Sequence, residues 1–147
     1  MKLTSKLLIG AGVLLVGLAV VYRAVNCAPD KSLSSDAQML QVINDGGCMD
    51  CHSSEPNLPF YANLPAAKNL IRKDIDGGYA VFDIAPLKAA LENGTVPDEV
   101  DLAKTEDVIR DGSMPLAKYY LIHWGSSVTA AKRTAVLSGV KDLRAAF

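Results

Sequence analysis

The segment Cys48-Met49-Asp50-Cys51-His52 reads C-x-x-C-H, and the rest of the chain is organised around it. This pattern is the attachment site of a c-type haem. Its two thiols add across the vinyl groups of the porphyrin, and the histidine that follows at once can bind the iron from one side. The residues therefore predict one covalently bound haem c, attached through Cys48 and Cys51, with His52 as the proximal iron ligand.

Other uses of the same motif remain open from the residues alone. A redox C-x-x-C expects a preceding strand in a β-α-β frame, whereas residues 34–46 look helical. A zinc site would need more ligands at close spacing, and only Cys27 and His123 remain, both distant in the sequence. A chance match is the third alternative. The context of an exported chain, where haem c is assembled, favours the haem interpretation.

A helix is predicted immediately before the motif. Ser34 or Ser35 can cap it, and it runs to about Asn44. Its apolar residues recur at helical spacing and are Ala37, Leu40 and Ile43. Gly46-Gly47 ends this helix and lets the backbone turn tightly into the motif.

A loop is predicted after His52, because Pro56 and Pro59 exclude regular helix. Its large apolar side chains are expected to pack in the core, and they are Leu58, Phe60 and Tyr61.

Helices account for most of the remaining chain. The expected segments run from Pro65 to Gly77-Gly78, from Pro86 to Gly94, from near Pro97 to Gly112, from Pro115 to Trp124, and from a cap at Ser127 or Thr129 onward. The apolar stripe expected on the last helix consists of Val136, Leu137, Val140, Leu143 and Phe147. Its outer face is expected to carry Lys132, Arg133, Lys141 and Arg144. The first and last helices of the domain should cross, and no segment alternates like a strand, so the predicted fold class is all-α.

Met114 is the best candidate for the sixth ligand of the haem iron. A methionine sulfur often binds the iron opposite the histidine in electron-transfer cytochromes. Met114 lies in a loop beside Pro115, where its neighbours can hold it. His123 is the rival ligand, and ligation by two histidines would lower the reduction potential. Met114 as an ordinary core residue is the remaining alternative.

The N-terminal segment contains an uninterrupted apolar run from Leu7 to Tyr22. Lys2 and Lys6 precede it, which places the N-terminus in the cytoplasm and the following domain outside. The run suits a retained anchor or a signal peptide, and the absence of an A-x-A cleavage pattern favours the anchor. Cys27 is then a free thiol or, less in keeping with the preceding asparagine, an acylated lipoprotein cysteine. We therefore expect a single-pass protein of the bacterial inner membrane with its haem domain in the periplasm.

Length and charge limit the organisation further. The 147 residues suit one membrane anchor (1–27), a linker (28–35) and one domain (36–147). The net charge is −1, and every acidic residue lies after Arg23, so the domain is mildly acidic. This charge argues against a nucleic acid as partner.

Several stretches outside the motif resemble a known family. They are C-M-D-C-H-S, L-P-F-Y, G-Y-A-V-F-D and S-M-P followed by Y-Y-L-I-H-W. Together they resemble the N-terminal haem domain of membrane-anchored tri-haem bacterial cytochrome c peroxidases, including the quinol peroxidases. The resemblance implies that Cys48 and Cys51 form the thioethers and that His52 is the proximal ligand. Met114 matches the Met-Pro stretch of that family.

The sequence departs from the family in one respect. Those peroxidases carry two further C-x-x-C-H motifs, whereas this sequence has one. The resemblance therefore implies electron entry, from quinol or an electron-donor protein, to a peroxidase module or another cytochrome, rather than peroxide cleavage by this chain. The alternative hypothesis is a haem enzyme or sensor whose sixth iron position is open to peroxide or a gas. A non-haem binding module ranks third.

Overall fold

The computed structural model describes residues 3–146, and within this range the chain contains helices and no β-strand. The all-α prediction is therefore confirmed. The elements in chain order are α1 (Leu3–Val25), α2 (Ser35–Asp45), η1 (Cys48–Asp50), η2 (Phe60–Asn63), α3 (Pro65–Val81), α4 (Ala85–Asn93), α5 (Glu99–Asp111), α6 (Ala117–Tyr120), η3 (Trp124–Ser126) and α7 (Ala130–Arg144). The three elements named η are short 3₁₀ helices.

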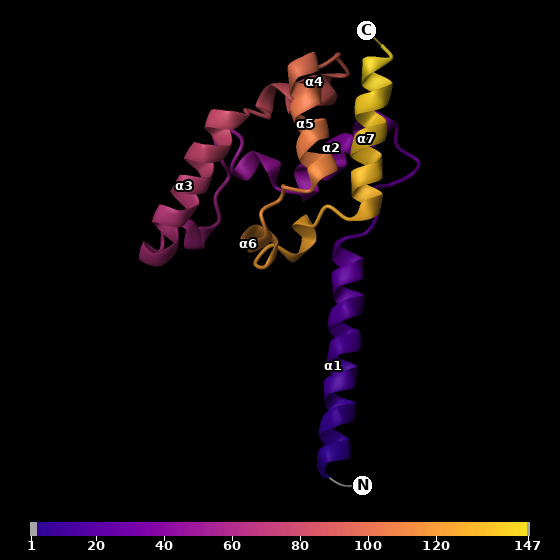
Figure 1. The fold of residues 1–147 in the computed structure, drawn as a ribbon, viewed down its shortest axis with the longest axis vertical. Helices are drawn as coiled ribbons and strands as arrows, with labels where there is room; N and C mark the ends of the chain where they lie inside the picture. The colour runs from indigo at the N-terminus through magenta and orange to yellow at the C-terminus, as the bar shows by residue number, and fades with distance from the viewer. Residues whose placement is uncertain (1–2, 147) are drawn as a thin grey trace.

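Helix α1 projects from the helical head as a single rod (Figure 1). It is longer than the predicted run from Leu7 to Tyr22, because helical backbone continues through the flanking residues. The apolar span Thr4–Val25 has 22 residues, and none of it is buried by the head. At about 1.5 Å per residue, this length can cross a hydrocarbon core of about 30 Å. α1 is therefore compatible with the expected membrane anchor.

The core of the head forms where α2 crosses α7, as predicted for the first and last helices of the domain. Helices α4 and α5 complete it. The crossing is close at Gly139 of α7, where an added Cβ would lie 2.9 Å from both the Met39 Cβ and the Ser35 carbonyl oxygen. The buried apolar residues of the four helices include Met39, Val42, Ile43, Leu87, Leu91, Leu102, Ile109, Val136 and Val140.

Most helix ends lie where the sequence predicts them. Asp98 caps α5 by accepting a hydrogen bond from the Val100 N–H at 2.7 Å. Thr129 is the N-cap of α7. Gly94 and Gly112 end α4 and α5 in the left-handed conformation, with φ of 64° and 71°. Glycine adopts this conformation without steric cost, which explains both ends.

Two predicted helix ends are wrong. Helix α3 passes through Gly77-Gly78 and ends at Val81. The tight packing of Gly78 against the haem motif, described below, gives that glycine a structural role inside a helix. The segment predicted as one helix from Pro115 to Trp124 contains only the short helix α6, followed by a turn and η3.

Three predicted side-chain positions are also wrong. Phe60 is 86% exposed and Leu58 is 40% exposed, so neither is part of the core. Lys132 is 1% exposed rather than on the outer face of α7, because its Nζ donates to the Gly125 carbonyl at 3.2 Å and pairs with Asp45 at 3.3 Å. Buried Lys132 thus joins α7 to the end of α2 and to η3. Phe147, the last residue of the predicted stripe, lies outside the described residues.

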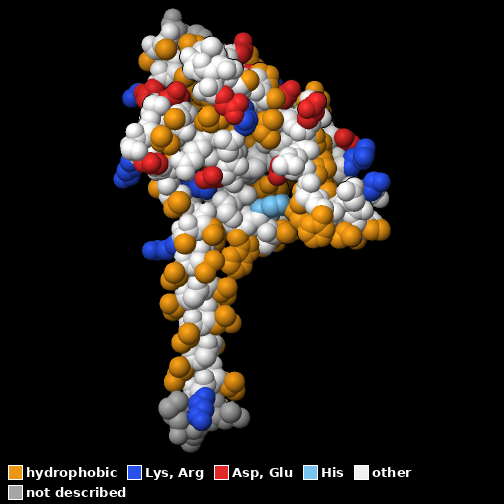
Figure 2. Space-filling model, turned by 180° about the vertical axis from the view of Figure 1, so that it is seen from behind, with side chains coloured by type: hydrophobic (Ala, Val, Ile, Leu, Met, Phe, Trp, Pro, Cys, Tyr) orange, Lys and Arg blue, Asp and Glu red, His pale blue; other side chains and the backbone are white. Residues whose placement is uncertain are grey.

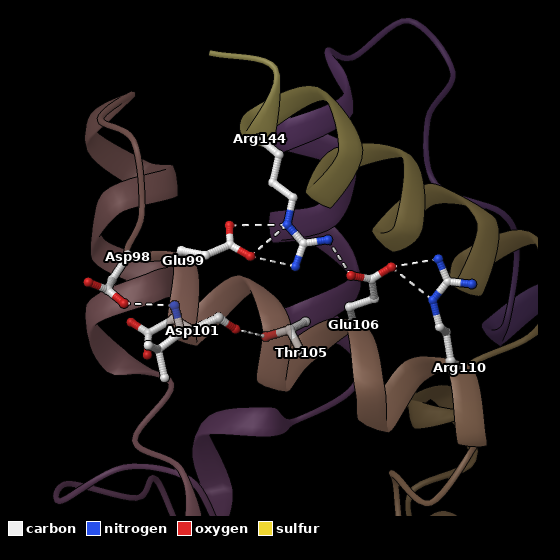
Figure 3. A network of polar contacts seen from close by, with 8 residues as sticks. Asp98, Glu99, Asp101, Thr105, Glu106, Arg110 and Arg144 are labelled. Carbon is white, nitrogen blue, oxygen red and sulfur yellow. Dashed lines mark hydrogen bonds and ion pairs between the residues drawn. The ribbon is translucent and has the colours of Figure 1, made fainter. Parts of the chain in front are cut away.

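A network of ion pairs holds α5 against α7 (Figure 3). The Arg144 guanidinium binds Glu99 and Glu106 of α5, and Glu106 also binds Arg110 one turn later. These hydrogen bonds from Arg110 and Arg144 lower the pKa of Glu106 below its ordinary value. This pairing turns Arg144, predicted on the outer face of α7, toward a neighbouring helix.

Candidate haem site

The C-x-x-C-H motif forms a tight turn directly after α2. Gly47 has a φ of 65°, and the 3₁₀ turn that follows contains the first motif residues. The His52 N–H donates to the Cys48 carbonyl at 3.1 Å, which closes the turn. A side chain at Gly47 would also collide with the Tyr119 hydroxyl. Glycine is thus required here by both backbone conformation and space.

The two motif thiols are partly buried beside one another and are not bonded to each other. Burial raises the pKa of Cys48 to about 11 and also raises the pKa of Cys51. A catalytic redox C-x-x-C depends on a lowered thiol pKa, because the thiolate is its nucleophile. The described residues also lack the strand that a redox frame needs. The structure therefore argues against thiol–disulfide exchange at this motif.

His52 is held in one orientation by the segment that follows α3. Its Nδ1 lies 2.9 Å from the Phe82 carbonyl oxygen, and the Ile84 N–H donates to the His52 carbonyl at 2.8 Å. A carbonyl only accepts, so Nδ1 carries the proton and donates it to Phe82. Within residues 3–146 no hydrogen-bond partner faces Nε2. This is the arrangement of a metal-binding imidazole whose second nitrogen is fixed by the backbone.

Helix α3 supports the motif from the other side through Gly78. A Cβ added at Gly78 would lie 2.5 Å from the Cys51 carbonyl oxygen, whereas one added at Gly77 would meet nothing within 4 Å. The sequence analysis missed this contact. The signal available was the glycine pair itself, which marks either a helix end or a close backbone approach.

His123 belongs to a polar cluster with Tyr61, Tyr119 and Asp50. Its Nδ1 lies 3.0 Å from the Tyr119 carbonyl oxygen, and its Nε2 lies 2.6 Å from the Tyr61 hydroxyl. The Tyr119 ring stacks on the imidazole at 4.0 Å, and its hydroxyl donates to Asp50 at 2.5 Å. Burial and the neighbouring Asp50 carboxylate raise the pKa of Tyr119. Both ring nitrogens of His123 are therefore occupied, and iron ligation would break the bond to Tyr61.

The roles of Tyr61, Tyr119 and Asp50 were not predicted, because their contacts join residues far apart in sequence. A cleft of about 410 Å³ opens beside them, with Asp50, Leu58, Pro59, Tyr119 and His123 among its lining residues. A second cavity, of about 530 Å³, lies away from the motif between α5 and α7 and is lined mainly by polar and charged residues.

Met114 lies half-buried in the loop between α5 and α6. Its peptide bond to Pro115 is cis. At the start of this loop, the Asp111 carboxylate accepts a hydrogen bond from the Ser113 N–H at 2.8 Å. The two thiols and the pre-oriented imidazole of the motif fit a c-type haem, and Met114 offers a thioether on a separate loop. By contrast, no cluster of three or more His, Cys, Asp or Glu able to hold a metal ion occurs within residues 3–146.

Comparison with known proteins supports haem binding. A family model described as a haem-binding domain matches residues 14–142. The chain belongs to this haem-binding domain family.

The haem-binding domain is also similar to the cytochrome c peroxidase of Escherichia coli strain K12. The two are 31% identical over 116 residues, which cover 79% of this chain and 25% of the relative. The domain thus spans about a quarter of the length of that protein. No solved structure matches the chain. Family and relative together support a haem-based redox role.

Proposed function

We propose that this chain is a membrane-anchored c-type cytochrome domain that transfers single electrons through one covalently attached haem. The main support is the orientation of His52. Its Nδ1 is fixed by the Phe82 carbonyl, which leaves Nε2 for a metal. The bound haem supplies one-electron chemistry, because its iron alternates between the ferric and ferrous states. Cys48 and Cys51 hold the porphyrin by thioether bonds, so the carrier is not lost when partners change.

The proposed axial ligands are His52 Nε2 and the Met114 sulfur. The contacts of His123 support this choice, since both of its nitrogens already have partners. The chain can then fix the reduction potential by three means, namely the thioether ligand, the burial of the site and the hydrogen bond on His52 Nδ1. We assign His123 to hydrogen bonding at the side of the site rather than to the iron.

The proposed partners follow from the proposed membrane anchor and from the similarity to a peroxidase. As a membrane anchor, α1 would hold the domain at the outer face of the inner membrane, where quinol or an electron-donor protein is the proposed donor. Similarity to a cytochrome c peroxidase supports a peroxidase module or another cytochrome as the acceptor. In this proposal the chain delivers electrons for peroxide reduction, and peroxide is not bound at its own iron.

The second candidate function is a haem enzyme or sensor with a displaceable sixth ligand. The name of the relative favours it, because a cytochrome c peroxidase acts on peroxide. The cleft beside His123 and Tyr61 would then give a small ligand access. It ranks second because Tyr61 and Tyr119 occupy the nitrogens that a distal base would need.

The first test is the optical spectrum of the haem-loaded protein in both oxidation states, extended into the near infrared. We expect a low-spin spectrum with the charge-transfer band of methionine-ligated iron. The band should disappear in Met114→Ala and persist in His123→Gln. Persistence of haem colour on a denaturing gel would confirm covalent attachment.

Other spectra would contradict specific parts of the proposal. A low-spin spectrum without that band, changed by His123→Gln, would identify His123 as the ligand. High-spin ferric iron that responds to cyanide or peroxide would place the enzyme or sensor first. Loss of haem from the denatured chain would exclude thioether attachment.

A further inference from the structure

Two uncharged segments expose apolar side chains on the side of the head from which α1 leaves. One is residues 56–67, around η2, and the other is residues 119–131, around η3, and neither contains Asp, Glu, Lys or Arg. In Figure 1, η2, the start of α3, and α6 lie at the level where α1 emerges. Figure 2 shows hydrophobic side chains gathered along this lower edge, with most charged side chains above it. The residues that define this underside patch are Phe60, Leu64, Leu121, Ile122 and Trp124.

The two segments form one continuous surface. The Tyr61 hydroxyl bonds to His123 Nε2 at 2.6 Å, which joins the middle of one segment to the middle of the other. Phe60 is 86% exposed, and Leu121 and Ile122 are 71% and 68% exposed. Clustered exposure of this kind marks an interaction surface rather than scattered apolar residues.

Part of this patch lies far from the proximal ligand. His52 binds Phe82, directly after α3, whereas Phe60 and Leu64 lie before its first residue. α3 has 17 residues, which at about 1.5 Å each separates its two ends by roughly 25 Å. The η2 part of the patch therefore lies away from His52, at the height in Figure 1 where α1 joins the head.

The patch is held in a fixed position relative to α1. Asn26, which is buried just after α1, donates from Nδ2 to the Trp124 carbonyl at 2.5 Å. Its Oδ1 accepts from the Ser127 N–H at 3.1 Å. η3 is thereby attached to the last turn of the helix that would span the membrane. An apolar surface held at this height meets the interface of the same bilayer.

We propose that the underside patch inserts into the outer interface of the bilayer that α1 spans, so that the head is held against the membrane at η2 and at the turn before η3. The inference rests on the proposed membrane anchor. Lipid is the occupant that fits, because the patch is apolar, carries an interfacial tryptophan and lies beside the end of the spanning helix. Of the lysines that border the two segments, Lys118 pairs with Asp74 at 2.7 Å and the buried Lys132 pairs with Asp45, whereas Lys68 is exposed.

Fluorescence of haem-loaded full-length protein in phosphatidylcholine vesicles tests this proposal. Cys27 is first replaced in Cys27→Ser, and a single new cysteine is then labelled with an environment-sensitive NBD dye. The new cysteine is introduced by Phe60→Cys in η2 or by Leu121→Cys in the turn before η3. Ile122→Cys is a second position in that turn. Dye on the native Cys27, directly after α1, is the interfacial reference. Val100→Cys is the matched control, since Val100 is exposed beside Glu99 and Arg144 at the far end of the head. Each sample is measured with and without nitroxide-labelled lipid, and the ratio cancels quenching by the haem.

We expect the dye at positions 121 and 60 to be quenched about as strongly as at Cys27 and several-fold more than at Val100. Quenching as weak as at Val100, in protein that resists carbonate extraction and retains its haem spectrum, would overturn the inference and leave the proposed function intact. Blue-shifted but unquenched emission would show that a second copy of the chain covers the patch, and it would also overturn the inference. Release by carbonate would overturn the inference together with the anchor.

Discussion

At the residue scale, glycines determine how closely the chain approaches the haem motif. Gly78 lies inside α3, where glycine costs about 1 kcal/mol relative to alanine, yet its lack of a side chain lets the helix contact the Cys51 backbone. Gly77 occupies the same helix without such a contact. The neighbouring glycines therefore separate a packing requirement from an ordinary helix position.

Gly78→Ala should lower both stability and haem attachment. The new methyl group would press on the Cys51 carbonyl, and overpacking of this kind costs about 1–3 kcal/mol. The measurements are the denaturant midpoint and the intensity of haem staining per mole of chain. Gly77→Ala is the control and should be neutral or stabilising. Equal behaviour of the two variants would contradict a supporting role for this contact.

At the element scale, the core of the head is built around the crossing of α2 and α7. The two helices approach each other most closely at Gly139. We expect Gly139→Ala to destabilise the domain by about 1–3 kcal/mol, because the added methyl group would overlap the Met39 side chain and the Ser35 carbonyl. Urea unfolding monitored by far-UV circular dichroism measures the change. Ser138→Ala, on the exposed neighbouring position, should leave the midpoint nearly unchanged. A tolerated Gly139→Ala would show that the helices can separate without loss.

The ion pairs between α5 and α7 predict a pH dependence. The pKa of Glu106 is lower in the folded chain than its ordinary value in the unfolded chain. The ionised carboxylate therefore stabilises the fold at pH values above the unfolded pKa, and this stabilisation is lost as the pH falls through the folded pKa. Glu106→Gln should therefore reduce stability at pH 7 and have little effect in acid. Urea midpoints at both pH values measure this difference. Asp107→Asn, one position on, is the control, and a pH-independent effect of Glu106→Gln would contradict the linkage.

The positions of helices can be predicted from the local sequence, whereas contacts between residues far apart in the chain cannot. The caps Asp98 and Thr129 and the left-handed Gly94 and Gly112 are local signals, and the predicted ends there are confirmed. The end of α3 was mispredicted because Gly78 serves a contact with Cys51, 27 residues earlier in the chain.

The same limit applies to side chains at the site. The motif identifies the two thiols and His52 by spacing alone. The acceptor on His52 is a backbone carbonyl 30 residues away, and a carbonyl has no sequence signature. Burial of Lys132 likewise depends on the Asp45 carboxylate and the Gly125 carbonyl, which only the folded chain brings together.

At the scale of the whole molecule, Asn26 connects the apolar rod to the head. Asn26→Leu should remove the acceptor of the Ser127 N–H and the donor to the Trp124 carbonyl, at a cost of about 1–2 kcal/mol. Amide hydrogen exchange around residues 124–127 should accelerate while the haem spectrum stays unchanged. Asn63→Leu, an exposed site in η2, is the control. Unchanged exchange in Asn26→Leu would show that this joint is not closed in solution.

The joint at Asn26 also affects how partners find this protein. A head on a loose tether presents every side to its surroundings, whereas a head clamped to a spanning helix keeps one height and one tilt relative to that helix. Its search for partners in the membrane then becomes lateral diffusion in a plane. The rate of productive collisions would follow the number of molecules per unit of membrane area, and the head would present the same side to every partner in the membrane.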